Sequence, residues 1–444
     1  MHDDLKTAYR EELDAWRGAR HRLTRRSTEV ILAAVFVFGV VPTAGAENAL
    51  TLPEALERTL EHNPEMRVFE WREGVLTGVR RAAGLAPGFE LGVEAENLVG
   101  TGDFAGADEL ELAVSLSSVI ELGDKRHNRT RVVDSRLAQL DAEEQARALD
   151  LLGEATQRFI SALALQEKLA IASDAVALAE TNLELVGERV DRGAAPAAER
   201  LRAEAALARA RLEVAAIQAE HTGLLAGISA LWGEPRPAFE RVAGDLYRSA
   251  PIGDFDSLDR RIESTPAVER FASEARLRDA ELALTQSRSS ADIRWRIGTR
   301  YHRGLDDTAL TAGVSIPLFA DSRNRGQLAS ARAAREMVDA EKRSALARLR
   351  ARVHSAWQAH AQAREAVATL KSDVIPALTK ALEQTRKAYE LGRYSYLDWI
   401  SAQRELLEAR RALADAAAEA LLNQALIEQL TAQSLADGRD MARP

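Results

Sequence analysis

Residues 192–201 read RGAAPAAERL, and residues 391–400 read LGRYSYLDWI. In both stretches a glycine follows a long segment rich in helix-forming residues, and another such segment comes directly afterwards. The second stretch begins 199 residues after the first. Each glycine therefore predicts a tight turn between two long helices, because glycine adopts left-handed backbone conformations easily.

A second pair of short segments has nearly the same spacing. Asn63-Pro64 precedes Thr265-Pro266 by 202 residues. A repeat that keeps its spacing over such a length indicates two copies of one structural unit. We expect one copy at residues 47–245 and the other at residues 246–434, with a connector of little regular structure at 233–265.

Four segments alternate between apolar and polar residues with a period of two, as strands with one apolar face do. They form two pairs, each with a link rich in Gly and Asp, and so predict β-hairpins at residues 89–121 and 292–319. The apolar face carries Phe89, Leu91, Trp295, Ile297 and Leu310. The opposite face carries Glu90, Glu94, Glu96, Arg294, Arg296 and Arg300.

These strands fit two kinds of protein. A soluble four-stranded sheet would bury its apolar face under helices. Strands of about ten residues also fit an outer-membrane barrel, with the apolar face toward lipid and the charged face toward the lumen. Four strands are too few to close a barrel, and open sheet edges are not tolerated in lipid, so the membrane alternative requires an oligomer.

Two long helices are predicted at residues 125–192 and 323–391, each about 100 Å long if straight. Pro376 is expected to kink the second one. In the last helix, large apolar residues recur every seven residues and alanines fill the alternate seam, as in closely packed coiled coils. The apolar positions are Trp399, Leu406, Leu413, Ala420 and Ile427, and the alanines are Ala402, Ala409 and Ala416.

The two ends of the chain predict export and disorder. Four arginines between residues 20 and 26, an apolar run at 30–41 and the small residues Ala44-Gly45-Ala46 are typical of a signal peptide at 1–46. The apolar run has 12 residues, too few to span a membrane as a helix. Residues 435–444 are expected to form a disordered tail.

The composition excludes several classes of function. The chain has no cysteine, so it forms no disulfide and no cysteine-bound metal site. A net charge of −9 gives no basic surface for nucleic acid. The eight histidines do not cluster, and no metal-binding, phosphate-binding or nucleophile motif occurs. We therefore expect no enzymatic activity and no cofactor.

In the order and spacing of these features, the sequence resembles the TolC-like outer-membrane factors of tripartite efflux and secretion systems. The segments that carry the resemblance are Leu50-Thr51-Leu52-Pro53-Glu54-Ala55-Leu56, Asn63-Pro64, Glu121-Leu122-Gly123-Asp124-Lys125-Arg126, Ile316-Pro317-Leu318-Phe319, Arg323-Asn324-Arg325-Gly326, and Tyr389, Gly392, Asp398, Ala402 and Gln403. Residues 121–126 and Leu231-Trp232-Gly233-Glu234-Pro235 are most similar to the CzcC-type branch, which partners heavy-metal exporters of the resistance-nodulation-division class.

The resemblance implies a mixed α/β homotrimer in the outer membrane of a Gram-negative bacterium. Each protomer would give four strands to a twelve-stranded barrel in outer-membrane lipid and long helices to a tunnel across the periplasm. Its partners would be a periplasmic adaptor protein and an inner-membrane exporter, and the protein itself would be a passive exit duct.

The resemblance also implies a gate at the two glycine turns. In this family a tyrosine three residues before the second glycine binds an acid on the first helix pair; the matching residues are Tyr389 and Glu199. An acidic ring often lies six residues after that glycine, which is Asp398. Two residues depart from the pattern: Tyr394 matches a gate arginine of the best-known member, and Ser401 matches its second acidic ring. Tyr389 is equally compatible with an ordinary packing role.

The turns themselves would meet the adaptor through Gly193, Ala194, Ala195, Gly392, Arg393, Tyr394 and Ser395. Two other functions fit the same residues. One is a type I secretion or drug-efflux duct of the same fold. The other is a soluble periplasmic coiled-coil scaffold whose strands form a soluble sheet.

Overall fold

The computed structural model of the protein describes residues 49–99, 101–102 and 108–432. The expected signal peptide at 1–46 and the expected tail at 435–444 lie outside these residues. The described chain divides into two compact units. The tip unit comprises residues 49–67, 147–265 and 348–432, and the sheet unit comprises residues 68–146 and 266–347. Each unit therefore takes segments from both halves of the chain.

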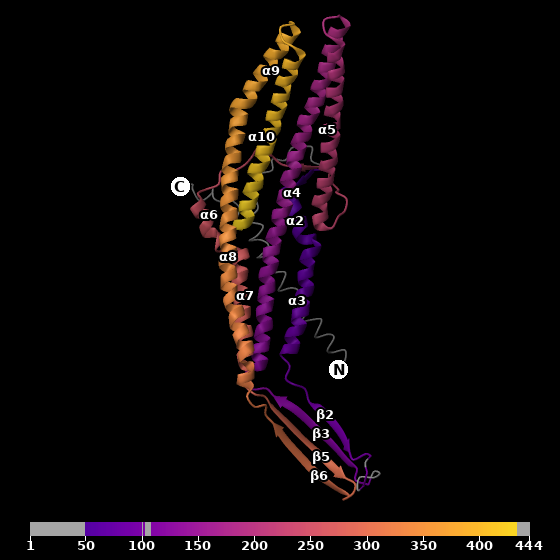
Figure 1. Ribbon diagram of the computed structural model, residues 1–444, viewed down its shortest axis with the longest axis vertical. Coiled ribbons are helices and arrows are strands. Elements are labelled where there is room, and N and C mark those ends of the chain that lie inside the picture. The colour runs from indigo at the N-terminus through magenta and orange to yellow at the C-terminus, as the bar shows by residue number, and fades with distance from the viewer. Residues whose placement is uncertain (1–48, 100, 103–107, 433–444) are drawn as a thin grey trace. The chain divides into compact units, whose positions relative to one another are not determined.

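The same order of elements occurs twice along the described chain (Figure 1). The first half contains β1 (Ala49–Thr51), α2 (Leu52–His62), α3 (Pro64–Ala83), β2 (Glu90–Glu96), β3 (Glu111–Ile120), α4 (Lys125–Asp191), α5 (Ala197–Ser229) and the short η2 (Ala230–Trp232). The second half contains β4 (Arg241–Ala243), α6 (Phe255–Ile262), α7 (Pro266–Ser287), β5 (Ile293–His302), β6 (Asp307–Ser315), α8 (Ala320–Thr369), η3 (Leu370–Val374), α9 (Ile375–Glu390) and α10 (Tyr396–Thr431).

The connector predicted at 233–265 is more regular than its Gly, Pro and Asp content suggested. β4 pairs in parallel with β1, with Leu50 opposite Val242. α6 forms because Leu258 and Ile262 lie four residues apart and are both buried. The expectation of little regular structure was therefore wrong for these two segments.

The second long helix is irregular just before its proline. The five residues of η3 form a π-helical turn, and Pro376 occupies the first turn of α9. Proline has no backbone N–H and its ring crowds the carbonyl of the preceding turn, so a widened turn relieves both problems. The sequence predicted a kink at Pro376, and the structure places a π-helical turn directly before the helix segment that contains this proline.

Heptad packing is present in α10. Trp399, Leu406, Leu413, Ala420 and Ile427 are all buried. The alternate seam differs from the prediction: Ala409 is buried, but Ala402 and Ala416 are half-buried. Gln403, Ala417 and Gln424 are also buried, at spacings that are multiples of seven. Both glutamines have partners for their amide oxygens: Gln403 accepts from Asn182 of α4 at 2.6 Å, and Gln424 accepts from the Ala250 N–H at 3.1 Å.

The sheet unit contains one antiparallel sheet in the order β2-β3-β5-β6 (Figure 1). β2 and β5 run in the same sense and are separated by β3, as the hairpin pattern predicted. β6 begins at Asp307, because the link from β5 is a tight turn. The Tyr301 hydroxyl donates to Asp306 at 2.9 Å in that turn, and Asp306 adopts a φ of 51°.

Candidate functional site

One face of the sheet is apolar and exposed to solvent. Leu91 and Leu116 lie in one row with Ile297, and Val93 and Val114 lie in the next row with Leu310. Phe89 (73% exposed), Leu91 (72%) and Leu310 (76%) have almost the accessibility of an unfolded chain. Trp295 shares this face and meets Phe89 edge-on, with ring centroids 6.2 Å apart. All five residues predicted for the apolar face therefore lie on it.

The opposite face is charged and holds all six residues predicted for the lumen. Arg300 pairs with Glu111 at 2.9 Å and lies 3.8 Å from Glu96. Glu111, which the sequence analysis left out, stands between Glu96 and His302 in the register. Asp307 completes that row. The six predicted residues are three acids and three arginines, whose charges would nearly cancel. With Glu111 and Asp307 included, the described strands carry five carboxylates against three arginines on this face, so the expected balance does not hold.

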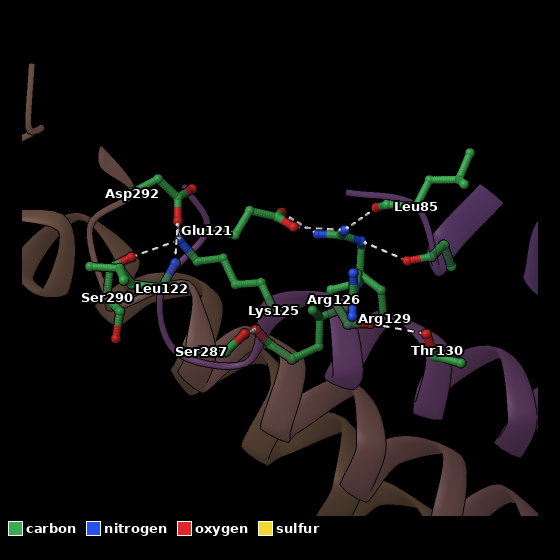
Figure 2. A network of polar contacts seen from close by, with 12 residues as sticks. Leu85, Glu121, Leu122, Lys125, Arg126, Arg129, Thr130, Ser287, Ser290 and Asp292 are labelled. Atoms are coloured by element: carbon green, nitrogen blue, oxygen red, sulfur yellow. Dashed lines mark hydrogen bonds and ion pairs between the residues drawn. The ribbon is translucent and has the colours of Figure 1, made fainter. Parts of the chain in front are cut away.

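A polar network ties the start of α4 to two neighbouring connections (Figure 2). The Lys125 ammonium donates to Asp292 at 2.6 Å and to the Ser290 carbonyl at 2.7 Å. The backbone N–H of Leu122 donates to the same Asp292 oxygen at 3.1 Å. The turn before α4 is thereby fastened to the link between α7 and β5.

Arg129 extends this network on its other side. Its guanidinium forms a bidentate ion pair with Glu121, one bond of which measures 2.9 Å (Figure 2). Its Nε lies 3.4 Å from the Ala83 carbonyl oxygen of α3. The turn between Glu121 and Lys125 requires a glycine at position 123. Its φ is +77°, and a Cβ there would lie 2.8 Å from the Ser290 hydroxyl oxygen. The residues of 121–126 that suggested a family resemblance are therefore those that join the sheet to the helices.

The two glycine turns are built alike. Gly193 N–H donates to the Val190 carbonyl at 2.9 Å, and Ala194 N–H donates to Arg189 at 2.8 Å. Gly392 and Arg393 repeat both bonds, at 2.9 and 2.8 Å, with the residues 199 positions later. Both glycines have positive φ, as this helix-ending motif requires. Of the predicted adaptor-contacting residues, Ala195 is half-buried and the other six are exposed.

Tyr389 and Glu199, predicted as a gate pair, meet in the structure. The Tyr389 hydroxyl donates to Glu199 Oε2 at 3.2 Å, joining α9 to α5. The ring is 3% exposed and stacks on Trp399, with centroids 5.0 Å apart. Burial and the nearby Glu199 carboxylate raise the pKa of Tyr389 to about 12, so the hydroxyl remains a donor at neutral pH. The hydrogen bond and the packing contact are thus both present.

Asp398 has a different role within the protomer. It caps the start of α10: the Ser395 hydroxyl donates to its carboxylate at 2.7 Å and the Ser395 N–H at 2.9 Å. These hydrogen bonds lower the pKa of the Asp398 carboxyl. The structure therefore does not join Asp398 to the Tyr389–Glu199 pair. A further residue contacts this pair: Arg189, four residues before Gly193, donates to the Tyr389 carbonyl and lies over the Tyr389 ring. The sequence did not point to Arg189.

Neither a membrane-spanning helix nor a metal site is found in the described residues. No helix there is long and apolar enough to cross a membrane. Within residues 49–99, 101–102 and 108–432, no three His, Asp or Glu side chains are placed to hold a metal ion.

The fold is shared by solved outer-membrane channels. The outer-membrane channel OprN superposes with a TM-score of 0.72 at 20% identity, over 86% of this chain and 90% of that chain. The channel CusC gives a TM-score of 0.72 at 15% identity, over 89% and 95%.

The sequence matches the family described as "Outer membrane efflux protein" over residues 55–234 and 279–433, and the chain belongs to this family. The cobalt-zinc-cadmium resistance protein CzcC of Cupriavidus metallidurans is 27% identical over 295 residues, covering 66% of this chain and 70% of CzcC. The nickel-cobalt-cadmium resistance protein NccC of Alcaligenes xylosoxydans xylosoxydans is 25% identical over 323 residues, covering 70% and 72%.

Proposed function

We propose that this protein is the outer-membrane exit duct of a tripartite efflux system and acts as a homotrimer without catalysis. The proposal rests on two properties of the sheet. Its apolar face is exposed, and in the described part of the chain β2 and β6 each have a neighbouring strand on one side only. In lipid such edges must be paired, and three copies with four strands each are enough to close a barrel.

The proposed cargo is divalent heavy-metal cations. CzcC and NccC are both named for resistance to cobalt and cadmium, and one of them also for zinc, the other for nickel. The proposed partners are a periplasmic adaptor and an inner-membrane exporter of the resistance-nodulation-division class. The exporter would select the cargo.

The proposed gate lies at the glycine turns. Tyr389 and Glu199 would latch α9 to α5 in the closed state, and three copies of Asp398 would form an acidic ring. The exposed turn residues Gly193, Ala194, Gly392, Arg393, Tyr394 and Ser395, with Ala195 beside them, would receive the adaptor. The Tyr389–Glu199 hydrogen bond and the shared geometry of the two turns support this assignment.

The function is tested by deleting the gene and measuring cell-associated zinc, cobalt and cadmium after exposure to each salt. Accumulation above the parent, restored by the wild-type gene, is the expected result. The purified protein should require detergent and form pores in planar lipid bilayers. A detergent-free soluble protein would favour the scaffold alternative, and normal metal levels with a secretion or drug-sensitivity defect would favour the other ducts.

The charged face of the sheet predicts a weak preference for cations. An excess of two carboxylates per protomer would line the barrel, and Arg300 is already neutralised by Glu111. Reversal potentials in a KCl gradient should show a small preference for potassium, which Glu111→Gln combined with Asp307→Asn reduces. A preference for chloride, or a strong selectivity that survives both these substitutions and loss of the Asp398 charge, would contradict this assignment.

Asp398→Asn is expected to weaken block of the channel by hexaamminecobalt(III) about tenfold, because three carboxylates at one level attract a multivalent cation. Asparagine keeps an oxygen that accepts from Ser395, so the start of α10 stays capped. Glu390→Gln is the matched control, since Glu390 pairs with Arg386 on its own helix at 3.0 Å. Equal block of wild type and Asp398→Asn in planar bilayers would remove Asp398 from the ring.

A further inference from the structure

Arg189 of α4 reaches across to the second helix pair. Its Nη1 donates to the Tyr389 backbone carbonyl at 2.7 Å, and its Nη2 lies 3.4 Å from the Ala194 carbonyl. The same guanidinium lies over the Tyr389 ring, 4.5 Å from its centroid. One side chain thus contacts the C-terminal ends of both α4 and α9.

The partners of Arg189 are suited to a cation. The Tyr389 carbonyl belongs to the last turn of α9, where the helix dipole is negative, and it also accepts from the Gly392 N–H at 2.9 Å. The Ala194 carbonyl lies just past the end of α4. Because both acceptors are backbone groups, this contact does not depend on the protonation of any carboxylate. The Arg189 Nε is buried and has no hydrogen-bond partner, so the hydrogen bonds of this guanidinium are made by its two terminal nitrogens.

Tyr389 is consequently held at two places by the first helix pair. Glu199 of α5 holds its hydroxyl, and Arg189 of α4 holds its backbone and covers its ring. Replacing Tyr389 by phenylalanine removes only the hydroxyl contact. Replacing Arg189 by alanine removes the carbonyl bond and the contact with the ring together.

We propose that Arg189 is a positioning residue of the gate: it holds the end of α9 against α4 and so keeps the Tyr389 hydroxyl directed at Glu199. The inference rests on the proposed function, in which the two helix pairs separate when the channel opens. A positioning role for Arg189 predicts that two kinds of substitution open the gate to different extents. Loss of the Tyr389–Glu199 hydrogen bond alone should open the tip only partly, whereas loss of Arg189 should open it more.

A reporter thiol tests this in the purified protein in detergent. The chain has no cysteine, and Ala203 is 1% exposed in the cluster formed with Val186, Tyr389 and Trp399. In an Ala203→Cys background, Arg189→Ala should speed maleimide labelling about tenfold or more, as expected for the loss of a charge-assisted hydrogen bond. Arg189→Lys should give an intermediate rate, because it retains the charge but not the planar fork.

The matched control is Arg192→Ala. Arg192 directly follows the last residue of α4 and pairs with Glu188 of that helix at 2.9 Å. Its loss should leave the labelling rate unchanged. Tyr389→Phe combined with Glu199→Gln should give a rise smaller than that of Arg189→Ala. Circular dichroism establishes that each variant keeps its helices, and Arg189→Lys provides the comparison should Arg189→Ala fail to fold.

Single-channel conductance in planar bilayers is the second readout, and it should rise in the same order. If both Arg189 variants label and conduct like Arg192→Ala, the positioning role of Arg189 is overturned. This holds even if the wild-type protein conducts normally. If the wild type forms no pore but the labelling contrast persists, the proposed channel function fails while the role of Arg189 at the tip stands. The two failures are therefore distinguishable.

Discussion

For the proposed trimer, Trp295→Arg is expected to abolish assembly in the outer membrane. Trp295 lies on the apolar face of β5, where it meets Phe89 edge-on. An arginine facing lipid near the middle of the bilayer costs about 2–4 kcal/mol per copy, or about 6–12 kcal/mol for three copies. A cost of that size is comparable to the whole stability of a folded domain. Heat-modifiable trimers on a gel, and the amount of protein in outer-membrane fractions, measure the effect.

Two matched variants separate lipid exposure from loss of packing. Trp295→Phe keeps an aromatic ring toward Phe89 and should assemble normally. Arg296→Ala changes the neighbouring residue on the charged face, where Arg296 is opposite Ser117 and Gly313, and should also be tolerated. If Trp295→Arg assembles as well as these two and stays soluble without detergent, then the apolar face does not contact lipid.

The faces of the sheet were predictable from the sequence because the side-chain period of a strand is two. The alternation of apolar and polar residues along each strand assigned Phe89, Leu91 and Trp295 to the apolar face, and the structure places them together there. The position of Glu111 required the register of β3 against β5, which places it opposite His302. Register depends on pairing between strands that are far apart in the sequence, so the charge balance of the face needed the structure.

The proposed gate residues illustrate the same limit. The Tyr389–Glu199 contact followed from a resemblance in the order of residues around two glycines, and the hydrogen bond confirms that the two side chains meet. Arg189 was missed because it donates to backbone carbonyls. Every residue has a backbone carbonyl, so the sequence does not show which residues are its partners. Asp398 was interpreted only as a member of an acidic ring, although Ser395 three residues earlier is the signal of a helix cap.

The connector was misjudged for a related reason. Gly, Pro and Asp are frequent in turns, and they obscured the buried pair Leu258 and Ile262. β4 has only three residues and is stabilised by β1, nearly 200 residues earlier in the chain. Short elements that depend on distant partners carry little local signal. The long helices, by contrast, repeat the same apolar spacing over many turns and were predicted closely.

Lys125→Met is expected to destabilise the junction between the sheet and the helices by about 2–4 kcal/mol, because it leaves a partly buried carboxylate and a carbonyl without their cation. The Lys125 side chain is 10% exposed, and its partner Asp292 is 32% exposed. Solvent reaches Asp292, so the cost lies below that of a fully buried pair. The midpoint of guanidinium unfolding, followed by circular dichroism in detergent, measures the loss.

A double-mutant cycle identifies the cause of that loss. Arg126→Met removes a charge from the next residue, whose side chain is exposed, and should change the midpoint little. Lys125→Met combined with Asp292→Leu replaces the ion pair by apolar groups, which is often close to neutral. We expect the double variant to be more stable than Lys125→Met alone, because the unpaired carboxylate is then gone. If Lys125→Met unfolds at the same guanidinium concentration as Arg126→Met, the Lys125–Asp292 pair does not hold the junction, and the ion pair of Arg129 with Glu121 becomes the remaining candidate.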